Sequence, residues 1–380
     1  MTPTAALVYG SALEAYDLGP LHPFKPQRFS LAVDLLGDYG VLGSEIALIE
    51  PTAAAAEQLQ RVHSPEYLRF LRAASADPAA WMEPMAGLGT PDDPVFLGAY
   101  EAAALACGAT TEALRSVLAG EYTRAMSIAG GLHHAHGDRA EGFCFLNDLA
   151  VAIAEALARD PGLRVAYVDI DAHHGDGVQD IFYAEPRVLT VSIHESGVFL
   201  FPGTGFSDEI GVGPGLGASA NLPLPQYATD ACFLLAMETF VEPLVTAFRP
   251  DVIVAQLGVD AHHADPLTTL GMTLPGYAAV VDSIVQLADR TCEGRLATTG
   301  GGGYGVYSVV PRAWAWATAR LGDVALPDEL PEAWKARVAT LGVKPPPQRL
   351  LEDDFVPDPM EDSALVKLTK RALRAGLSVQ

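Results

Sequence analysis

Four apolar segments of this chain are each followed directly by a short cluster of histidine, aspartate or glycine residues. The segments are short and rich in β-branched residues, and they are apolar at consecutive rather than alternate positions. Such runs are typical of strands in a parallel sheet that is covered on both faces. Segments with a helical pattern lie between them, and this alternation predicts an α/β domain with right-handed crossovers.

The individual elements can be placed along the chain. We predict buried strands at Val165–Asp169, Val188–Ile193, Asp251–Leu257 and Leu296–Thr298, and two segments that fit the pattern less closely at Ala6–Tyr9 and Ala125–Ala129. We predict helices at Pro94–Leu118, Leu146–Arg159, Asp230–Phe248 and Leu274–Asp289. The acidic segment Glu352–Asp362 and the basic segment Lys367–Arg374 indicate a surface excursion and a C-terminal helix, with a solvated tail as the alternative.

The polar clusters that follow these strands begin at residue 130 and end at residue 304. In an open α/β sheet, ligands bind outside the carboxyl ends of the strands. The clusters can therefore form one site only if their strands belong to one sheet. We predict a single domain over residues 1–380, although length alone would suggest about two or three. A C-terminal extension of about residues 345–380 is expected to pack on this domain.

The charge balance excludes several classes of protein. The chain has 24 Lys and Arg against 47 Asp and Glu, a net charge of −23, and 49% of its residues are hydrophobic. That is a globular composition rather than a disordered one. The acidity argues against a nucleic-acid partner, and no uncharged apolar run approaches the ~18 residues of a membrane span. The four separated cysteines form no C-x-x-C pair, which favours a reducing cytoplasm.

The segment Asp169-x-Asp171-x-His173 places three potential ligands on one face at the end of a strand. A buried carboxylate needs a partner or a cation. With Asp260 from another strand-end loop, Asp171 and His173 make a set of two carboxylates and one histidine, which suits Zn²⁺, Fe²⁺ or Mn²⁺. Three protein ligands leave positions open for water and substrate. The alternative is turn-forming aspartate beside a core histidine.

The adjacent residues His133 and His134 can enter one pocket only if the backbone turns, and the preceding Gly130-Gly131 makes such a turn plausible. As general acid/base groups, each would need a carboxylate on its other ring nitrogen, and Asp169 and Asp176 are available. The alternatives are a metal-ligand pair or surface residues. The nearby His136 is expected to be structural or at the surface.

Four consecutive glycines, Gly300–Gly303, lack the Lys-Ser/Thr ending of a P-loop and the spaced glycines of a dinucleotide fingerprint. They instead let the backbone pass close to a ligand and present Tyr304. Tyr304 could donate a hydrogen bond to a developing oxyanion, although a lone tyrosine is more often a packing residue.

Five motifs together resemble the zinc-dependent histone deacetylase superfamily, and in particular its bacterial acetoin-utilisation branch: GGLHHAHGDRAEGFCFLND, DIDAHHGDGVQDIFY, FPGTG, GVDAHHADPL and GGGGY. The resemblance runs from His22 through at least Tyr304. It implies the arginase/deacetylase α/β fold, with a central, mainly parallel eight-stranded sheet flanked by helices.

The resemblance also assigns roles to individual residues. It implies zinc, with Fe²⁺ as the alternative in the cell, on Asp171, His173 and Asp260. It implies a catalytic set of His133, His134, Asp169, Asp176 and Tyr304. It implies an acyl-lysine tunnel and rim of Gly142, Phe143, Phe201, Leu267 and Asp92, with Asp93 as the alternative rim aspartate, and Arg28 near an acetate-release channel. It implies a structural K⁺ near Asp169, Asp171, His173, Ser192 and Ile193.

The implied activity is the hydrolysis of acetyl-lysine amides on a protein, with a metabolic acyl-CoA synthetase as a candidate substrate. Acetylpolyamine amidohydrolases share these motifs, and a catalytically silent acyl-lysine binding protein is a further alternative. Arginase-like enzymes use two manganese ions and the pattern D-A-H-x-D, but here Gly175 stands at the second-metal position. The oligomeric state stays open.

Overall fold

The computed structural model describes residues 3–80 and 84–379, so residues 1, 2, 81–83 and 380 of the expected domain lie outside it. Its centre is one eight-stranded sheet with the strand order β2-β1-β3-β8-β7-β4-β5-β6. Every neighbouring pair is parallel, which confirms the expected sheet. The strands are β1 Ala5–Val8, β2 Ile46–Ile49, β3 Arg124–Ser127, β4 Val165–Asp169, β5 Val188–Glu195, β6 Ser219–Leu224, β7 Val252–Gln256 and β8 Leu296–Thr299.

All six predicted strands are present, with boundaries that differ by at most two residues. The sequence did not predict β2 and β6, which form the two edges of the sheet. The β2 strand is only four residues long and partly exposed. The β6 strand contains Pro223, a residue that edge strands tolerate and central strands do not. The β2 strand is apolar throughout but only four residues long, whereas Asn221 and Pro223 interrupt β6.

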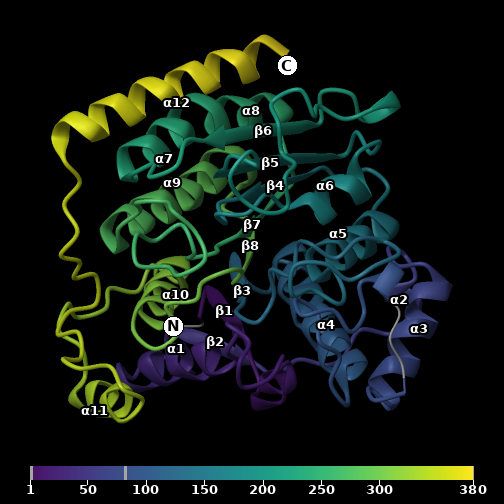
Figure 1. The fold of residues 1–380 in the computed structure, drawn as a ribbon, viewed down its shortest axis with the longest axis horizontal. Coiled ribbons are helices and arrows are strands. Elements are labelled where there is room, and N and C mark those ends of the chain that lie inside the picture. The colour runs from purple at the N-terminus through teal and green to yellow at the C-terminus, as the bar shows by residue number, and fades with distance from the viewer. Residues whose placement is uncertain (1–2, 81–83, 380) are drawn as a thin grey trace.

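Helices cover both faces of the sheet (Figure 1). Helices α4 and α5 pack together on one side of the sheet, and α9 and α10 pack together on the other. The α-helices are α1 Gln27–Asp38, α2 Ala56–Leu59, α3 Pro65–Ala76, α4 Ala99–Leu118, α5 Asp148–Arg159, α6 Asp176–Phe182, α7 Asp230–Ala236, α8 Glu242–Phe248, α9 Leu274–Cys292, α10 Val309–Leu321, α11 Glu332–Thr340 and α12 Pro359–Val379.

The predicted helix Pro94–Leu118 begins later than expected, at Ala99, because Gly98 adopts a left-handed conformation with a φ of 87°. The predicted helix Asp230–Phe248 is present, but the π-helical turn η4 (Met237–Val241) divides it. Pro243 explains this turn, since proline lacks the backbone N–H that would continue the regular hydrogen-bond ladder.

The segment Asp230–Phe248 is also long and apolar enough to cross a membrane by length and composition, with a hydropathy of 1.6 over a window that is 39% buried. One such helix is weak evidence for a membrane segment. Here α7 contacts both α9 and α12, so the segment is packed against the rest of the same chain.

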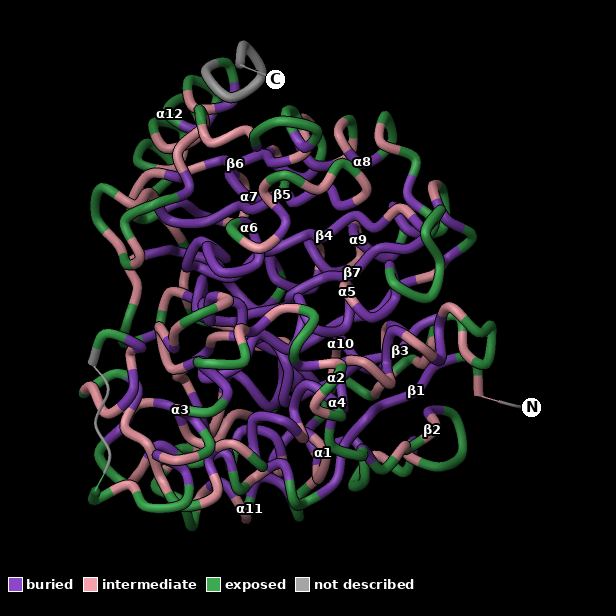
Figure 2. Tube along the Cα trace, turned by 90° about the vertical axis from the view of Figure 1, so that its right-hand side faces the viewer, coloured by how far each residue is buried: buried purple, intermediate pink, exposed green. Residues whose placement is uncertain are grey.

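The C-terminal region runs along one side of the molecule from α11 to α12 (Figure 1). The expected C-terminal helix is present as α12, which packs against β6 and α7. Figure 2 shows the strands as buried and α12 as an outer element with mixed exposure. The division into one domain with a C-terminal extension of about residues 345–380 stays a prediction.

The strands β3, β8, β7 and β4, which precede the four polar clusters, are consecutive neighbours in the sheet. Their last residues are in register, because Ser127 pairs with Thr299, Thr299 with Gln256, and Gln256 with Asp169. The chain therefore leaves all four strands at the same level of the sheet. This alignment brings loops from residues 130 to 304 to one place.

Candidate active site

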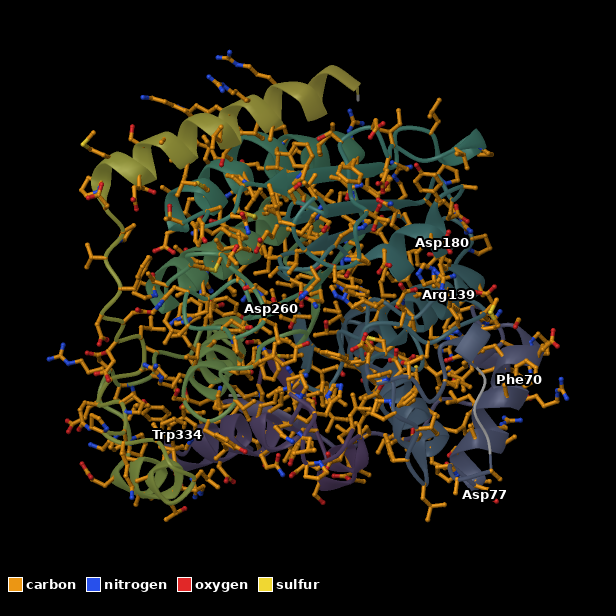
Figure 3. The ribbon with its side chains drawn as sticks, in the orientation of Figure 1. Phe70, Asp77, Arg139, Asp180, Asp260 and Trp334 are labelled. Atoms are coloured by element: carbon orange, nitrogen blue, oxygen red, sulfur yellow. The ribbon has the colours of Figure 1, made fainter. Side chains whose placement is uncertain are left out.

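The side chains of Asp171, His173 and Asp260 converge at the carboxyl ends of β4 and β7. His173 Nδ1 lies 2.9 Å from Asp260 Oδ2 and 3.1 Å from Asp171 Oδ1. Both carboxylates are buried, and Figure 3 shows Asp260 in the interior of the molecule. The structure thus brings together the three residues that the sequence predicted as a metal site.

The ionisation of these groups shows that the site suits a cation. Burial favours a neutral Asp171, but the charge on His133 and the hydrogen bond from His173 lower its pKa well below the ordinary value. Burial lowers the pKa of His173 as well, yet the hydrogen bonds to Asp171 and Asp260 raise it well above the ordinary value. A proton on His173 is thus shared between two buried carboxylates, and a metal ion would supply the same positive charge.

The glycine tract packs against these ligands. The backbone N–H of Gly302 donates to Asp171 Oδ2 at 2.7 Å, and a Cβ at Gly302 would lie 2.0 Å from Asp260 Oδ2. Gly301 has a φ of 149°, and a Cβ there would lie 2.2 Å from Gln256 Nε2. No side chain fits at either position, so the tract is needed for close approach of the backbone.

Gln256 is a residue that sequence reasoning missed. It is the last residue of β7, it is fully buried, and its Nε2 donates to Asp171 Oδ2 at 2.6 Å. Its Oε1 accepts the backbone N–H of Gly258 at 2.8 Å. These two bonds fix both the amide and the carboxylate. A polar residue at the end of an otherwise apolar strand was the signal in the sequence.

Replacing Gln256 with methionine is expected to weaken Zn²⁺ binding by about 10–100-fold, because groups that orient a metal ligand typically have effects of that size. Competition with a chromophoric chelator measures this affinity. Gln286→Met, at an exposed position on α9, is the matched control. Equal affinity in both variants would show that Gln256 does not orient Asp171.

The imidazoles of His133 and His134 lie side by side in the same pocket. His133 Nδ1 lies 2.8 Å from Asp169 Oδ2, and His134 Nδ1 lies 2.7 Å from Asp176 Oδ1. The two Nε2 atoms are 3.1 Å apart. Each histidine therefore has the carboxylate partner that was predicted for it.

The two histidines differ in charge. Burial lowers the pKa of His133, but the carboxylates of Asp169 and Asp171 outweigh this effect and bring the pKa to about 9. Burial and the positive charge on His133 lower the pKa of His134 below its ordinary value. At neutral pH, one ring is therefore a cation and its neighbour is a free base.

The backbone turn before these histidines is held by two side chains from the start of α5. Gly131 has a φ of 98°, and the carboxylate of Asp148 accepts its N–H at 3.0 Å. The side-chain amide of Asn147 donates to the carbonyls of His133 and Ala135, at 3.2 and 2.9 Å. These contacts turn both adjacent imidazoles into one pocket, as the two glycines suggested.

His63 supports the same turn from the α2–α3 connection. Its Nδ1 donates to the carbonyl of His136 at 3.0 Å, and its Nε2 accepts the N–H of Asn147 at 3.0 Å. Both ring nitrogens are used by a neutral imidazole. Burial accordingly lowers the pKa of His63 from 6.5 to about 4.

Acid is therefore expected to destabilise the fold through His63. Between pH 6.5 and 4 the unfolded chain binds a proton that the folded protein excludes, so stability falls as pH falls through this window. The shift corresponds to about 3 kcal/mol. Urea midpoints at pH 7.5 and 5.0 should differ less for His63→Gln than for the wild type. An unchanged difference would contradict the assignment.

His136 is a second residue whose place the sequence did not reveal. It is buried. Its Nε2 lies 3.4 Å from Asp176 Oδ2, and its Nδ1 lies 3.0 Å from Asp180 Oδ2. Burial lowers its pKa, but hydrogen bonds to Asp176, Asp180 and Glu141 raise it to about 11. Asp180 lies at the right-hand side of Figure 3, so a chain of contacts leads from His134 toward the surface. Asp176 and Asp180, one turn apart on α6, were the available signal.

A pocket beside the candidate metal ligands contains three of the six predicted substrate residues, Arg28, Gly142 and Phe143. It is lined by Arg28, His133, His134, Gly142, Phe143, Asp171, His173 and Tyr304, among others. The rings of Phe143 and Tyr304 pack edge to face, with their centroids 5.9 Å apart. The ring of Phe201 lies 5.0 Å from that of His134. Phe143 thus lines the pocket of the histidine pair and Phe201 contacts His134, while their role as tunnel walls stays a prediction.

The guanidinium of Arg28 lies at the inner end of this pocket. It is buried, its Nη1 donates to the carbonyl of Gly303 at 2.9 Å, and it lies over the rings of Phe24 and Trp314. Its Nε has no hydrogen-bond partner among the described residues. A buried cation with an unused donor can bind an anion such as acetate.

The outer end of the pocket opens beside a groove lined by residues of the 18–23 and 91–94 segments together with Phe143 and Leu267. Asp92 is exposed in this groove. Asp93, the alternative rim residue, is buried, and burial raises its pKa to about 8. Of the two aspartates, Asp92 has the position of a rim residue.

Two of the residues proposed for potassium, Asp171 and His173, are also proposed metal ligands, and the others lie in β4 and β5. Asp169 and Ser192 are register partners on β4 and β5, and Ile193 follows directly. Ser192 Oγ contacts His194 Nδ1 at 2.8 Å. The potassium assignment stays a prediction.

An eight-stranded parallel sheet, with polar loops gathered at one end around two carboxylates and a histidine, is the arginase/deacetylase fold. The comparisons with known proteins agree with this class. A model of the histone deacetylase domain matches residues 22–321. The chain is therefore a member of the histone deacetylase family, and this membership supports a deacetylase activity and a metal cofactor.

Individual relatives narrow the comparison. The chain is 41% identical to acetoin utilization protein AcuC of Bacillus subtilis (strain 168), over 87% of this chain and 85% of the relative. It is 37% identical to AcuC of Staphylococcus xylosus, over 88% of this chain and 87% of the relative. It is also similar to the crystal structure of an HDAC homolog from Aquifex aeolicus, with 29% identity, a TM-score of 0.84 and coverage of 98% and 100%. A homolog complexed with SAHA gives a TM-score of 0.83 at 29% identity, with coverage of 97% and 100%.

Proposed function

We propose that this protein hydrolyses acetyl-lysine amides on protein substrates and releases acetate, with one zinc ion held by Asp171, His173 and Asp260. The observation that carries the proposal is the position of the His133–His134 pair, which shares one pocket with Asp171 and His173. When bound, the ion would polarise a carbonyl oxygen and acidify water. The buried pair of carboxylates fits an ion of that charge.

His134 is the proposed general base. Its Nδ1 is held by Asp176, which leaves Nε2 to take a proton from the attacking water and later to give one to the lysine amine. Its lowered pKa keeps this nitrogen unprotonated at neutral pH. His133, whose pKa is about 9, supplies a positive charge beside the reaction rather than a base.

Tyr304 is the proposed oxyanion donor. Burial and the charge of Asp260 raise the pKa of its phenol well above the ordinary value, so the O–H is retained to donate. Phe143 and Phe201 would enclose the aliphatic part of the lysine and exclude water. Arg28 would receive the acetate, and K⁺ near Asp169 and Ser192 would support the loop from behind.

The groove at the entrance supports a polypeptide substrate over an acetylpolyamine. It is lined by Leu267 and by Phe143, which also lines the pocket of the histidine pair, so the chain on either side of an acetylated lysine could lie in it. Asp92, exposed in the groove, could accept a backbone N–H from that chain. A metabolic acyl-CoA synthetase in the cytoplasm is the substrate we propose from the family resemblance, and the four free cysteines fit that compartment.

Gly175 argues against a two-manganese, arginase-like site. A Cβ at this position would lie 2.4 Å from Asp169 Oδ2 and 3.1 Å from His133 Nδ1. A carboxylate for a second metal therefore has no room here. A silent binding protein is also disfavoured, because each predicted catalytic position holds a residue able to do its chemistry.

Side-by-side kinetics on an acetyl-lysine peptide and an acetylpolyamine test the proposal. We expect kcat/KM to be higher for the peptide, with acetate as a product. Faster hydrolysis of the acetylpolyamine would assign the chain to the other class of amidohydrolase. Binding of the peptide without acetate release would favour a silent binding protein.

A further inference from the structure

The C-terminal region crosses two of the loops that build the candidate active site. Its residues 349–355, here called the strap, lie between α11 and α12 on the left-hand side of Figure 1. The strap lies outside the part of the chain that matches the histone deacetylase model, which ends at residue 321. Its contacts with the two loops are polar and mostly buried.

The first contact is with α10, the helix that follows the Tyr304 loop. Arg312, on the first turn of α10, is buried, and its Nη1 donates to the strap carbonyls of Arg349 and Glu352 at 3.1 and 3.0 Å. The same side chain donates through Nε to the carbonyl of Ser308 at 2.7 Å. One guanidinium thus joins the strap to the connection that carries Tyr304.

The second contact is with the β7–α9 loop, which carries Asp260. Asp353 Oδ2 lies 2.8 Å from His262 Nε2, and its Oδ1 lies 2.8 Å from His263 Nε2. The same carboxylate accepts the backbone N–H groups of Leu274 and Phe355, each at 3.1 Å. Its side chain is only 5% exposed, whereas that of His263 is 25% exposed, so the contact with His262 is the better shielded of the two.

The two histidines and Asp353 could be taken for a second metal site, but the tautomer of His262 argues against it. His262 Nδ1 accepts the backbone N–H of Ala264 at 3.1 Å, so the ring proton is on Nε2. That nitrogen donates to Asp353 and has no lone pair for a metal. The cluster is therefore a clamp between the loop and the strap.

The clamp is linked to the active site through the fold of the loop. The carbonyl of His262 accepts the N–H of Asp265 at 2.8 Å, and Asp265 Oδ2 accepts the backbone N–H of Tyr304 at 2.7 Å. His262 N–H donates to the carbonyl of Val259, next to Asp260, at 3.1 Å. Asp353 thus fixes the turn that sets both Asp260 and Tyr304.

We propose that Asp353 is a positioning residue for deacetylation, which acts through His262 and the β7–α9 loop on the metal ligand Asp260 and on Tyr304. The expected effect on kcat rests on the proposed function. The expected effect on Zn²⁺ affinity does not depend on turnover.

Asp353→Ala and Asp353→Asn test the proposal in the full-length chain. The adjacent Asp354 is exposed and has no hydrogen bond from its side chain among the described residues, so Asp354→Asn is the matched control. We expect Asp353→Ala to lower both Zn²⁺ affinity and kcat by about tenfold, with KM within about threefold, as loss of an outer support typically does. Asp354→Asn should match the wild type.

A purely structural role would lower the melting temperature of Asp353→Ala but leave Zn²⁺ affinity and kcat equal to those of the control, and this result would overturn the proposal. If Asp353→Ala does not fold, the isosteric Asp353→Asn decides by the same two readouts. It keeps one acceptor oxygen and should show an intermediate loss. If the wild type deacetylates no peptide, the proposed function fails, while Zn²⁺ affinity alone still tests the clamp.

Discussion

Replacing His134 with alanine is expected to lower kcat for an acetyl-lysine peptide by about 10²–10⁴-fold, the usual contribution of a general base. The reason is the pairing of its Nδ1 with Asp176, which leaves Nε2 as the unprotonated nitrogen in the pocket. The metal should stay bound, because Asp171, His173 and Asp260 are unchanged. Steady-state kinetics with metal analysis of the same sample measures both effects.

His133→Ala is the comparison that makes this result informative. His133 is assigned a charge rather than a proton transfer, since its pKa is about 9. Replacing His133 with alanine should therefore lower kcat less than replacing His134 does. A larger loss for His133→Ala, with His134→Ala within tenfold of the wild type, would reverse the two assignments.

Tyr304→Phe is expected to lower kcat by about 10²–10³-fold, the size seen when one oxyanion donor is removed. The phenylalanine keeps the edge-to-face contact with Phe143, so the loss reports on the hydroxyl alone. KM and Zn²⁺ content should change little. Kinetics and metal analysis on the same preparation measure these quantities.

Tyr307→Phe is the matched control for this prediction. Tyr307 is three residues further along the same loop, partly buried, and not among the residues that line the pocket. We expect it to behave as the wild type. Comparable kcat for Tyr304→Phe and Tyr307→Phe would remove Tyr304 from the chemistry.

The sequence predicted the central sheet because β4, β5 and β7 are continuous apolar runs, and apolar periodicity is a local property. It also predicted the metal ligands, because Asp171 and His173 share one face at a strand end. Of the two edge strands, β2 is an apolar run of only four residues, and β6 is interrupted by Asn221 and Pro223. They become strands through pairing with β1 and β5.

The residues that support the site could not be predicted in the same way. Gln256, His136 and Asp353 act through partners that are distant in sequence. Asp353 contacts His262 across 91 positions, and Gln256 contacts Asp171 across 85. The spacing of residues along the sequence does not indicate that Asp353 pairs with His262 or that Gln256 pairs with Asp171. The resemblance to a family proposed the groups that would touch substrate or metal, and the fold was needed to show what holds them.

The most direct test of the account is acetate release from an acetyl-lysine peptide by protein that has been stripped of metal and titrated with Zn²⁺. Activity should be absent in the stripped protein and should rise linearly to a plateau at about one Zn²⁺ per chain, because Asp171, His173 and Asp260 are proposed to hold a single catalytic ion. Asp260→Ala should show no such rise. Activity that requires two Mn²⁺ per chain, or that persists without metal, would contradict the proposed mechanism.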